Sequence, residues 1–115
     1  MKGESPIVEW DGKQSRDFTY VSNVVEANLK ACVAAGASGE VINVACGSTT
    51  PIADIVKTLN EILDADIRPE SAPKRSGDVR KTYADIKKMK RLLKIKKLVR
   101  FEDGLKRTVE WFRKK

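Results

Sequence analysis

Residues 40–46, Glu40-Val41-Ile42-Asn43-Val44-Ala45-Cys46, carry apolar side chains at nearly every position, with Asn43 as the interruption. Successive side chains of a strand point to opposite faces of its sheet, so a strand here would be apolar on both faces. That pattern is typical of a parallel sheet, which helices cover on both sides. The segment therefore predicts an α/β chain with this strand near the middle of a sheet.

A helix is expected on each side of this strand. Before it, Asn23 and Glu26 form a capping-box pattern, which predicts a helix start near Asn23. After it, Thr50 is the expected N-cap and Pro51 the first helical residue. The clearest amphipathic helix of the chain follows, with apolar residues at Ile52, Ile55, Val56, Leu59, Ile62 and Leu63.

Further elements are expected outside this core. The composition favours short strands at 6–10, 17–21 and 67–71, and an extended segment at 82–84. Two more helices are predicted, one capped by Asp85 and one beginning near Glu102. The expected order is β-β-α-β-α-β-(β)-α-α, with four helices. These few strands cannot flank segment 40–46 on both sides, so part of its sheet is expected to lie outside this polypeptide.

The composition limits the chemistry. The 115 residues suit one domain, and the complete absence of histidine excludes Ser-His-Asp and Cys-His catalytic pairs and His-ligated zinc. Cys32 and Cys46 are expected to be reduced thiols, with a disulfide as the less favoured alternative. Neither a secretory leader nor an apolar run of spanning length is visible, which predicts a soluble, cytoplasmic chain without a membrane partner.

The net charge of +7 is unevenly distributed. Residues 1–67 hold 5 basic and 10 acidic side chains, whereas residues 68–115 hold 18 basic and 6 acidic ones. A basic region invites a polyanion, and the alternative, a solvated lysine-rich surface, is favoured for most of these lysines. The run at 87–100 lacks the aromatic residues on which single-stranded nucleic acid stacks, so a basic nucleic-acid-binding module is only an alternative.

Two segments have residues that suit phosphate. Arg16 follows a turn at Gly12, and a planar guanidinium can donate two parallel hydrogen bonds to a phosphate. The alternative, favoured by spacing alone, is a surface ion pair of Arg16 with Asp17 or Glu9.

The second segment is the loop Lys74-Arg75-Ser76-Gly77-Asp78-Val79-Arg80. It combines cations for phosphate oxygens, a glycine that permits close approach, and a carboxylate that can accept from sugar hydroxyls. A flexible basic loop is the equally weighted alternative.

Two further patterns are rejected. Tyr83 and Lys87 have the Tyr-x-x-x-Lys spacing of short-chain dehydrogenases, which arises easily by chance. Residues 36–39 are glycine-rich, but they lie between a helix and a strand, the wrong order for phosphate binding at a helix N-terminus.

Several spaced motifs, taken together, resemble one family. Residues 12–21 read Gly-Lys-Gln-Ser-Arg-Asp-Phe-Thr-Tyr-Val and resemble the Gly-x-Gln-x-Arg-Asp-(Phe/Tyr)-x-(Tyr/His)-Val pattern of extended short-chain dehydrogenase/reductases. This is the NAD-dependent epimerase/dehydratase family, which includes UDP-glucose 4-epimerase. The resemblance continues in order at residues 24–27, 41–47, 75–80, 84–88, 101–105 and 111–112. It covers essentially the whole chain.

The resemblance implies a role for this chain in substrate binding. It implies that Arg16 and Arg75 bind the diphosphate of a nucleotide-sugar, a UDP-sugar by analogy, that Asp78 accepts from the ribose, and that Phe18 lies beside the nucleoside. Arg80 is expected as an additional phosphate contact. No residue of this chain is assigned to catalysis, to a cofactor or to a metal.

The resemblance also implies what this chain lacks. The family's NAD loop and its Ser/Thr-Tyr-Lys catalytic set belong to an N-terminal Rossmann half that would precede residue 1, so NAD is implied only for the full-length family. Trp10 stands where the family has a second glycine before Gly12. Residues 1–115 are thus interpreted as a single C-terminal, partial Rossmann-type portion that is inactive alone. A third reading is a structural fragment that completes its sheet with another copy or with the missing half.

Overall fold

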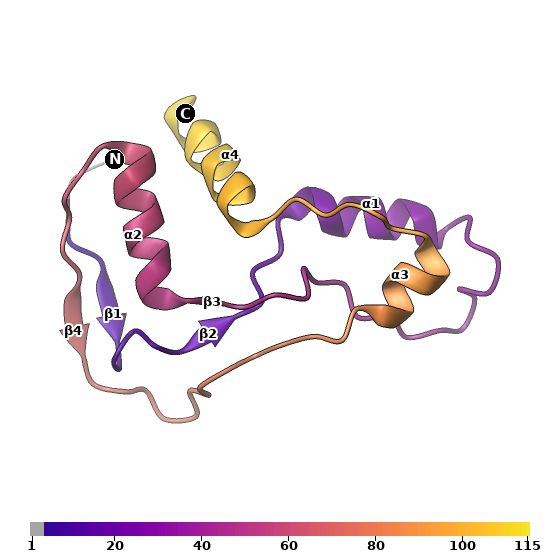
Figure 1. The fold of residues 1–115 in the computed structure, drawn as a ribbon, viewed down its shortest axis with the longest axis horizontal. Coiled ribbons are helices and arrows are strands. Elements are labelled where there is room, and N and C mark those ends of the chain that lie inside the picture. Colours follow the sequence, from indigo (N-terminus) through magenta and orange to yellow (C-terminus); the bar gives the residue numbers. More distant parts are fainter. Residues whose placement is uncertain (1–3) are drawn as a thin grey trace.

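The computed structural model describes residues 4–115, in which four helices and four short strands form an elongated arrangement of 48 × 36 × 19 Å (Figure 1). In chain order the elements are β1 (Ile7–Glu9), β2 (Ser15–Arg16), α1 (Val21–Ala31), β3 (Thr50–Pro51), α2 (Ile52–Leu63), β4 (Glu70–Ala72), α3 (Lys87–Leu93) and α4 (Phe101–Arg113). The α/β class and the four helices that the sequence predicts are confirmed.

The strands form two small sheets. β1 and β4 pair in parallel, with Ile7 opposite Glu70 and Glu9 opposite Ala72, while β2 and β3 pair antiparallel. A tight turn joins β1 to β2, and at its Gly12 (φ +69°) a Cβ would lie 3.4 Å from the Cβ of Ala53 at the start of α2. This turn therefore packs directly on α2.

The predicted central strand at 40–46 is wrong. Within residues 4–115 this segment is extended but pairs with no strand, and the third strand in chain order is β3 instead. Ala45 is buried against α1 and α3, whereas Val41 is 85% exposed. An apolar segment becomes a strand only when another backbone supplies its hydrogen bonds, and the described part of the chain offers none.

The helix predicted to start near Asn23 is confirmed, but the predicted capping role of Asn23 is wrong, for a non-local reason. α1 begins at Val21 after Tyr20, and Asn23 is a buried helical residue, not a cap. The Asn23 amide donates from Nδ2 to the Val99 carbonyl oxygen (2.9 Å) and accepts from the Val99 N–H at Oδ1 (2.9 Å). Asn23 thus ties α1 to the segment that leads into α4.

Other boundaries shift by a few residues. Thr50 lies in β3 and Pro51 is itself the N-cap of α2, while α3 begins at Lys87 after Ile86, with Asp85 Oδ1 accepting from the Lys87 N–H (2.8 Å). The strand predicted at 17–21 is wrong, because none of these residues lies in a strand and β2 ends just before them. The strand predicted at 67–71 overlaps β4, and residues 82–84 form no strand. β1 within 6–10 is confirmed, as are the helix at 52–63 and a last helix that begins one residue before Glu102.

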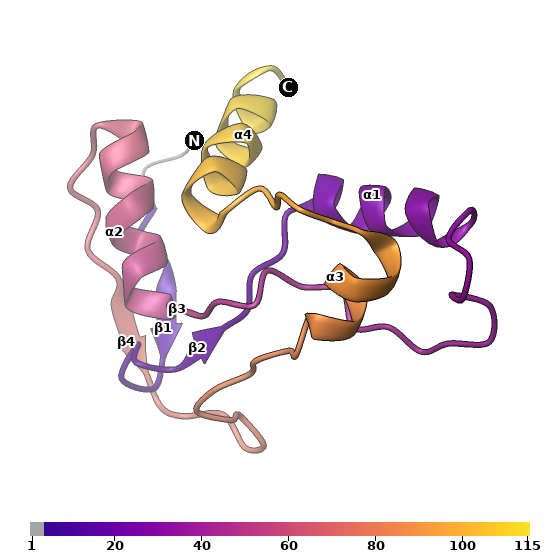
Figure 2. The ribbon, with the colours of Figure 1, turned by 45° about the vertical axis from the view of Figure 1, so that its right-hand side comes forward.

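The two ends of the molecule differ in their packing. At one end α2 lies beside β1 and β4, and at the other α1 lies beside α3, with α4 rising between them (Figures 1 and 2). The buried core lies at the α1–α3 end and consists of Ala27, Ala45, Ile86, Met89, Leu93 and Ile95. α4 approaches Tyr20 closely, because a Cβ on Gly104 would lie 2.9 Å from the Tyr20 Cβ. No helix in the described chain is long and apolar enough to cross a membrane.

Candidate functional site

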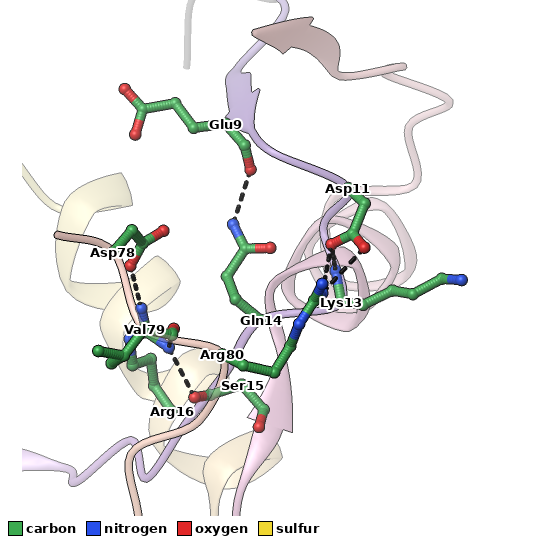
Figure 3. A network of polar contacts seen from close by, with 9 residues as sticks. All are labelled: Glu9, Asp11, Lys13, Gln14, Ser15, Arg16, Asp78, Val79 and Arg80. Atoms are coloured by element: carbon green, nitrogen blue, oxygen red, sulfur yellow. Dashed lines mark hydrogen bonds and ion pairs between the residues drawn. The ribbon is translucent and has the colours of Figure 1, made fainter. Parts of the chain in front are cut away.

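The guanidinium group of Arg16 is fixed where β2 meets the loop at 74–80 (Figure 3). Its Nη1 donates to the carbonyl oxygens of Ser15 and Val79, each at 2.9 Å, and its Nη2 is paired with the Asp78 carboxylate. Arg16 and Asp78 are 62 residues apart in sequence. The structure therefore brings together two of the predicted site residues, and the ion pairs expected as alternatives, with Asp17 or Glu9, are not the ones it contains.

Arg75 lies on the same loop and is far more open to solvent. Its side chain is 73% exposed and pairs through Nε with the Glu9 carboxylate at the end of β1. The Asp78 N–H donates to the Arg75 carbonyl oxygen (3.3 Å), so one turn carries both residues. A Cβ placed on Gly77 would meet nothing within 4 Å, which leaves this turn open on that side.

Arg80 is held by a different carboxylate. Its Nη1 donates to both Asp11 oxygens, at 2.7 and 2.8 Å, and its Cζ lies 3.7 Å from the centre of the Trp10 ring. The hydrogen bond from Arg80 lowers the pKa of Asp11. Arg80 is thus anchored to the β1–β2 turn. Arg16, Arg75 and Arg80, each paired with a carboxylate, form what we call the arginine cluster.

Phe18 lies elsewhere. Its ring centre is 5.5 Å from that of Phe101 at an interplanar angle of 46°, and both line a hollow of about 240 Å³ under α4 together with Tyr20 and Leu105. The ring of Phe18 packs against α4. The predicted place of Phe18 beside a nucleoside stays a prediction.

Asp17 is a residue whose role the sequence reasoning missed. Its two carboxylate oxygens accept from the backbone N–H groups of Cys46 and Gly47, each at 2.9 Å. Burial, and then the Asp17 carboxylate, raise the pKa of the Cys46 thiol. Asp17 therefore fastens the end of segment 40–46 beside the candidate site. The sequence did not show which groups Asp17 binds, because these partners lie about 30 residues away.

Gln14 is a second such residue. It is only 5% exposed, and its Nε2 donates to the Glu9 carbonyl oxygen (2.7 Å) across the turn. This bond braces β1, which carries the carboxylate partner of Arg75. The Gly-x-Gln-x-Arg-Asp pattern was the signal that could have pointed to both Gln14 and Asp17.

Tyr83 and Lys87, the pair rejected above, contact different partners in the structure. Lys81 lies over the Tyr83 ring, while Lys87 pairs weakly with Asp85 at 3.9 Å. Within residues 4–115 no three histidine, cysteine, aspartate or glutamate side chains gather as metal ligands would.

The comparisons with known proteins point to one family. The family model described as the NAD dependent epimerase/dehydratase family matches residues 1–45. A putative UDP-glucose 4-epimerase of Methanocaldococcus jannaschii is 33% identical over 98% of this chain and 36% of its own length. A UDP-glucuronate 4-epimerase of Thermodesulfobacterium geofontis is 35% identical over 94% of this chain and 33% of its own.

Solved structures agree. The chain resembles a crystal structure of UDP-glucose 4-epimerase from Thermotoga maritima with UDP-glucose, at a TM-score of 0.91 and 42% identity over 98% of this chain and 36% of that one. It also resembles UDP-glucuronic acid 4-epimerase from Bacillus cereus, in complex with UDP-glucuronic acid and NAD, at a TM-score of 0.90 and 27% identity, with the same coverage. The chain thus spans about a third of the length of the relatives it matches.

Proposed function

This chain belongs to the NAD-dependent epimerase/dehydratase family, and from that premise we propose that it is the C-terminal portion that binds the nucleotide-sugar of a UDP-sugar epimerase, dehydratase or decarboxylase. The observation that carries the proposal is the arginine cluster, in which Arg16 and Asp78 meet at one loop that also presents Arg75.

The geometry supports a diphosphate ligand. The carbonyl oxygens of Ser15 and Val79 hold Nη1 of Arg16, so this guanidinium is oriented before any ligand arrives. Arg75 is mostly exposed and can turn from Glu9 to a phosphate oxygen. A guanidinium group forms bidentate hydrogen bonds with phosphate as it does with carboxylate, so a phosphate can take the place of these carboxylate contacts. Asp78, released from Arg16, can then accept from ribose hydroxyls.

The proposal assigns the chemistry to the whole enzyme and none of it to this chain alone. Relatives whose structures contain NAD are about three times as long as this chain, and no described residue is assigned to NAD. The exposed apolar side of α1 and segment 40–46, which joins no strand within the described residues, support packing against the NAD-binding half of the family fold. In the proposed parent enzyme, that half carries the NAD-dependent oxidation of the sugar.

The direct test is isothermal titration calorimetry with UDP and UDP-glucose. We expect binding at millimolar ligand, and at least about a tenfold loss of affinity in Arg75→Ala, which corresponds to about 1.4 kcal/mol. The exposure of Arg75 makes this variant a safe one for folding. Lys106→Ala on α4, also exposed, is the matched control and should bind like wild type. Absence of binding heat at millimolar ligand, or an unchanged affinity in Arg75→Ala, would contradict the proposal.

A second variant tests the displaced carboxylate. If a phosphate competes with Glu9 for Arg75, then Glu9→Gln should bind UDP more tightly than wild type, because the competing charge is gone. The same variant should leave the affinity for uridine, which has no phosphate, unchanged. An equal or weaker affinity for UDP would argue against competition at Arg75.

A further inference from the structure

Trp10 has a backbone conformation that is uncommon for its side chain. Its φ is +63°, in the left-handed region that favours glycine. The conformation is kept in place because the Trp10 N–H donates to the Ala72 carbonyl oxygen (2.8 Å) just beyond the β1–β4 pairing. A glycine would adopt this backbone conformation without strain, so a tryptophan at this position suggests that its side chain has a role.

The Trp10 ring provides that reason, because two cations lie over it. Nζ of Lys74 is 4.0 Å and Cζ of Arg80 is 3.7 Å from its ring centre. Both distances fall within the range of an attractive cation–π contact. Lys74 and Arg80 stand at the two ends of residues 74–80, so a single ring contacts both ends of this loop.

Between these ends the loop is held by side-chain contacts with Arg16 and Glu9. Arg75 is exposed and Gly77 faces open space, while Asp78 is tied to Arg16. At the Arg80 end, the Ser15 N–H donates to the Arg80 carbonyl oxygen (2.9 Å). The contacts with Trp10 and Asp11 therefore anchor the two ends of the loop that presents Arg75 and Asp78.

We propose that Trp10 is a positioning residue of the nucleotide-sugar site: its ring holds both ends of residues 74–80, so that Arg75 and Asp78 stand beside Arg16. This inference rests on the proposed function. Trp10 acts through Lys74 and Arg80 and need not touch the ligand itself. Trp10 strains the backbone of the turn, but its ring orders residues 74–80 before a ligand binds. This preorganisation lowers the entropy cost of binding.

The test separates positioning from stability. Trp10→Gly relieves the strained backbone and removes the ring, Trp10→Leu keeps the strain and removes the π face, and Trp10→Phe keeps an aromatic face. We expect UDP affinity, measured by calorimetry, to fall at least tenfold in Trp10→Gly and Trp10→Leu and to recover largely in Trp10→Phe. The urea midpoint of Trp10→Gly should stay close to that of wild type. A merely structural role would instead lower stability and affinity together, without rescue by Trp10→Phe.

Hydrogen exchange supplies a readout that needs no ligand. In Trp10→Gly the Ser15 N–H, bonded to the Arg80 carbonyl, should exchange at least tenfold faster, while the Cys46 N–H, bonded to Asp17, should not change. Unchanged Ser15 exchange, or wild-type UDP affinity in Trp10→Leu, would overturn the inference. If wild type itself takes up no UDP, the proposed function fails, and the exchange of Ser15 still decides whether Trp10 holds the loop.

Discussion

The arginine cluster and the outer side of α1 differ in how many of their side chains have partners within this chain. In the cluster, each of three arginines has a carboxylate partner from another segment. The α1 face, which we define as the exposed apolar residues on and just after α1, has no such partners within the described residues; its members are Val21, Val24, Val25, Leu29 and Val33. A groove of about 750 Å³ runs along this face beside residues 97–99.

The contrast indicates which functions this chain can perform by itself. The charged groups of the arginine cluster pair within the chain, so no other polypeptide is needed to set the geometry of this site. Contiguous exposed apolar side chains, in contrast, mark a surface that something else covers. Under the proposed function, the remaining part of the family fold would cover this surface, because the relatives have about two thirds of their length outside the matched region.

A large effect is expected at Asp17, which follows Arg16 and fastens the end of segment 40–46. Asp17→Ala removes the acceptor of two backbone N–H groups, from Cys46 and Gly47. Hydrogen bonds to a charged group contribute about 1.5–3 kcal/mol each, so we expect the free energy of unfolding to fall by about 3 kcal/mol. Urea unfolding followed by circular dichroism measures it.

The exposed Asp66 provides the control for this variant. Asp66→Ala should change the free energy of unfolding by less than about 0.5 kcal/mol. If Asp17→Ala and Asp66→Ala lower the free energy of unfolding by the same small amount, Asp17 does not fasten the end of segment 40–46.

The two cysteines test how segment 40–46 packs. Cys32 is exposed, whereas Cys46 is half-buried and its pKa is raised by burial and by the Asp17 carboxylate. Because the thiolate is the reactive form, we expect iodoacetamide at pH 8 to label Cys46 at least about tenfold more slowly than Cys32. Mass spectrometry of the labelled peptides follows both rates, which should converge in urea. Equal rates in the folded chain would mean that segment 40–46 does not pack as described.

Substitutions on the α1 face should cost much less stability than substitutions in the buried core. Leu29→Lys and Val33→Lys place charges on side chains that are already exposed, so each should change the free energy of unfolding by less than about 0.5 kcal/mol. The same variants should reduce binding of the fluorescent dye ANS. Met89→Ala in the buried core is the contrasting control and should cost about 2–5 kcal/mol. A comparable loss from Leu29→Lys would show that the α1 face is already covered.

The smallest effect concerns pH. The Arg80 hydrogen bond lowers the pKa of Asp11 in the folded chain below its ordinary value of 3.8. A lowered folded pKa adds stability above the ordinary pKa, and this stability is lost as the pH falls toward the folded pKa. Wild type should therefore be slightly more stable than Asp11→Asn at pH 7, and the difference should fade below about pH 4. A difference that persists at pH 2 would rule out the Asp11–Arg80 pair as its source.

Local patterns in the sequence predicted local structure well. The helix at 52–63 was recognisable because its apolar residues repeat at helical spacing, and the turn at Gly12 because its dipeptide favours one. Segment 40–46 misled for a physical reason: its composition shows that it suits a buried strand, but pairing depends on a backbone that lies outside residues 4–115. Asn23 misled likewise, since a capping pattern cannot reveal a partner as distant as Val99.

The candidate site shows the same limit. The motifs singled out Arg16, Arg75 and Asp78, and the structure joins Arg16 to Asp78. It pairs Arg75 with Glu9, a partner that was weighed only for Arg16. The roles of Asp17 and Trp10 depend on contacts with residues far along the chain, so no spacing rule could have supplied them.

The central claim is that the arginine cluster, not the α1 face or the lysine-rich segment 87–100, receives the ligand. The most direct measurement is a ¹H–¹⁵N NMR titration of the wild-type chain with UDP. The account predicts shifts confined to residues 9–18 and 74–80, with saturation at millimolar UDP and no change along α1. Shifts spread over 87–100 and removed by salt would point to non-specific polyanion binding. That result, or an unperturbed spectrum, would contradict the claim.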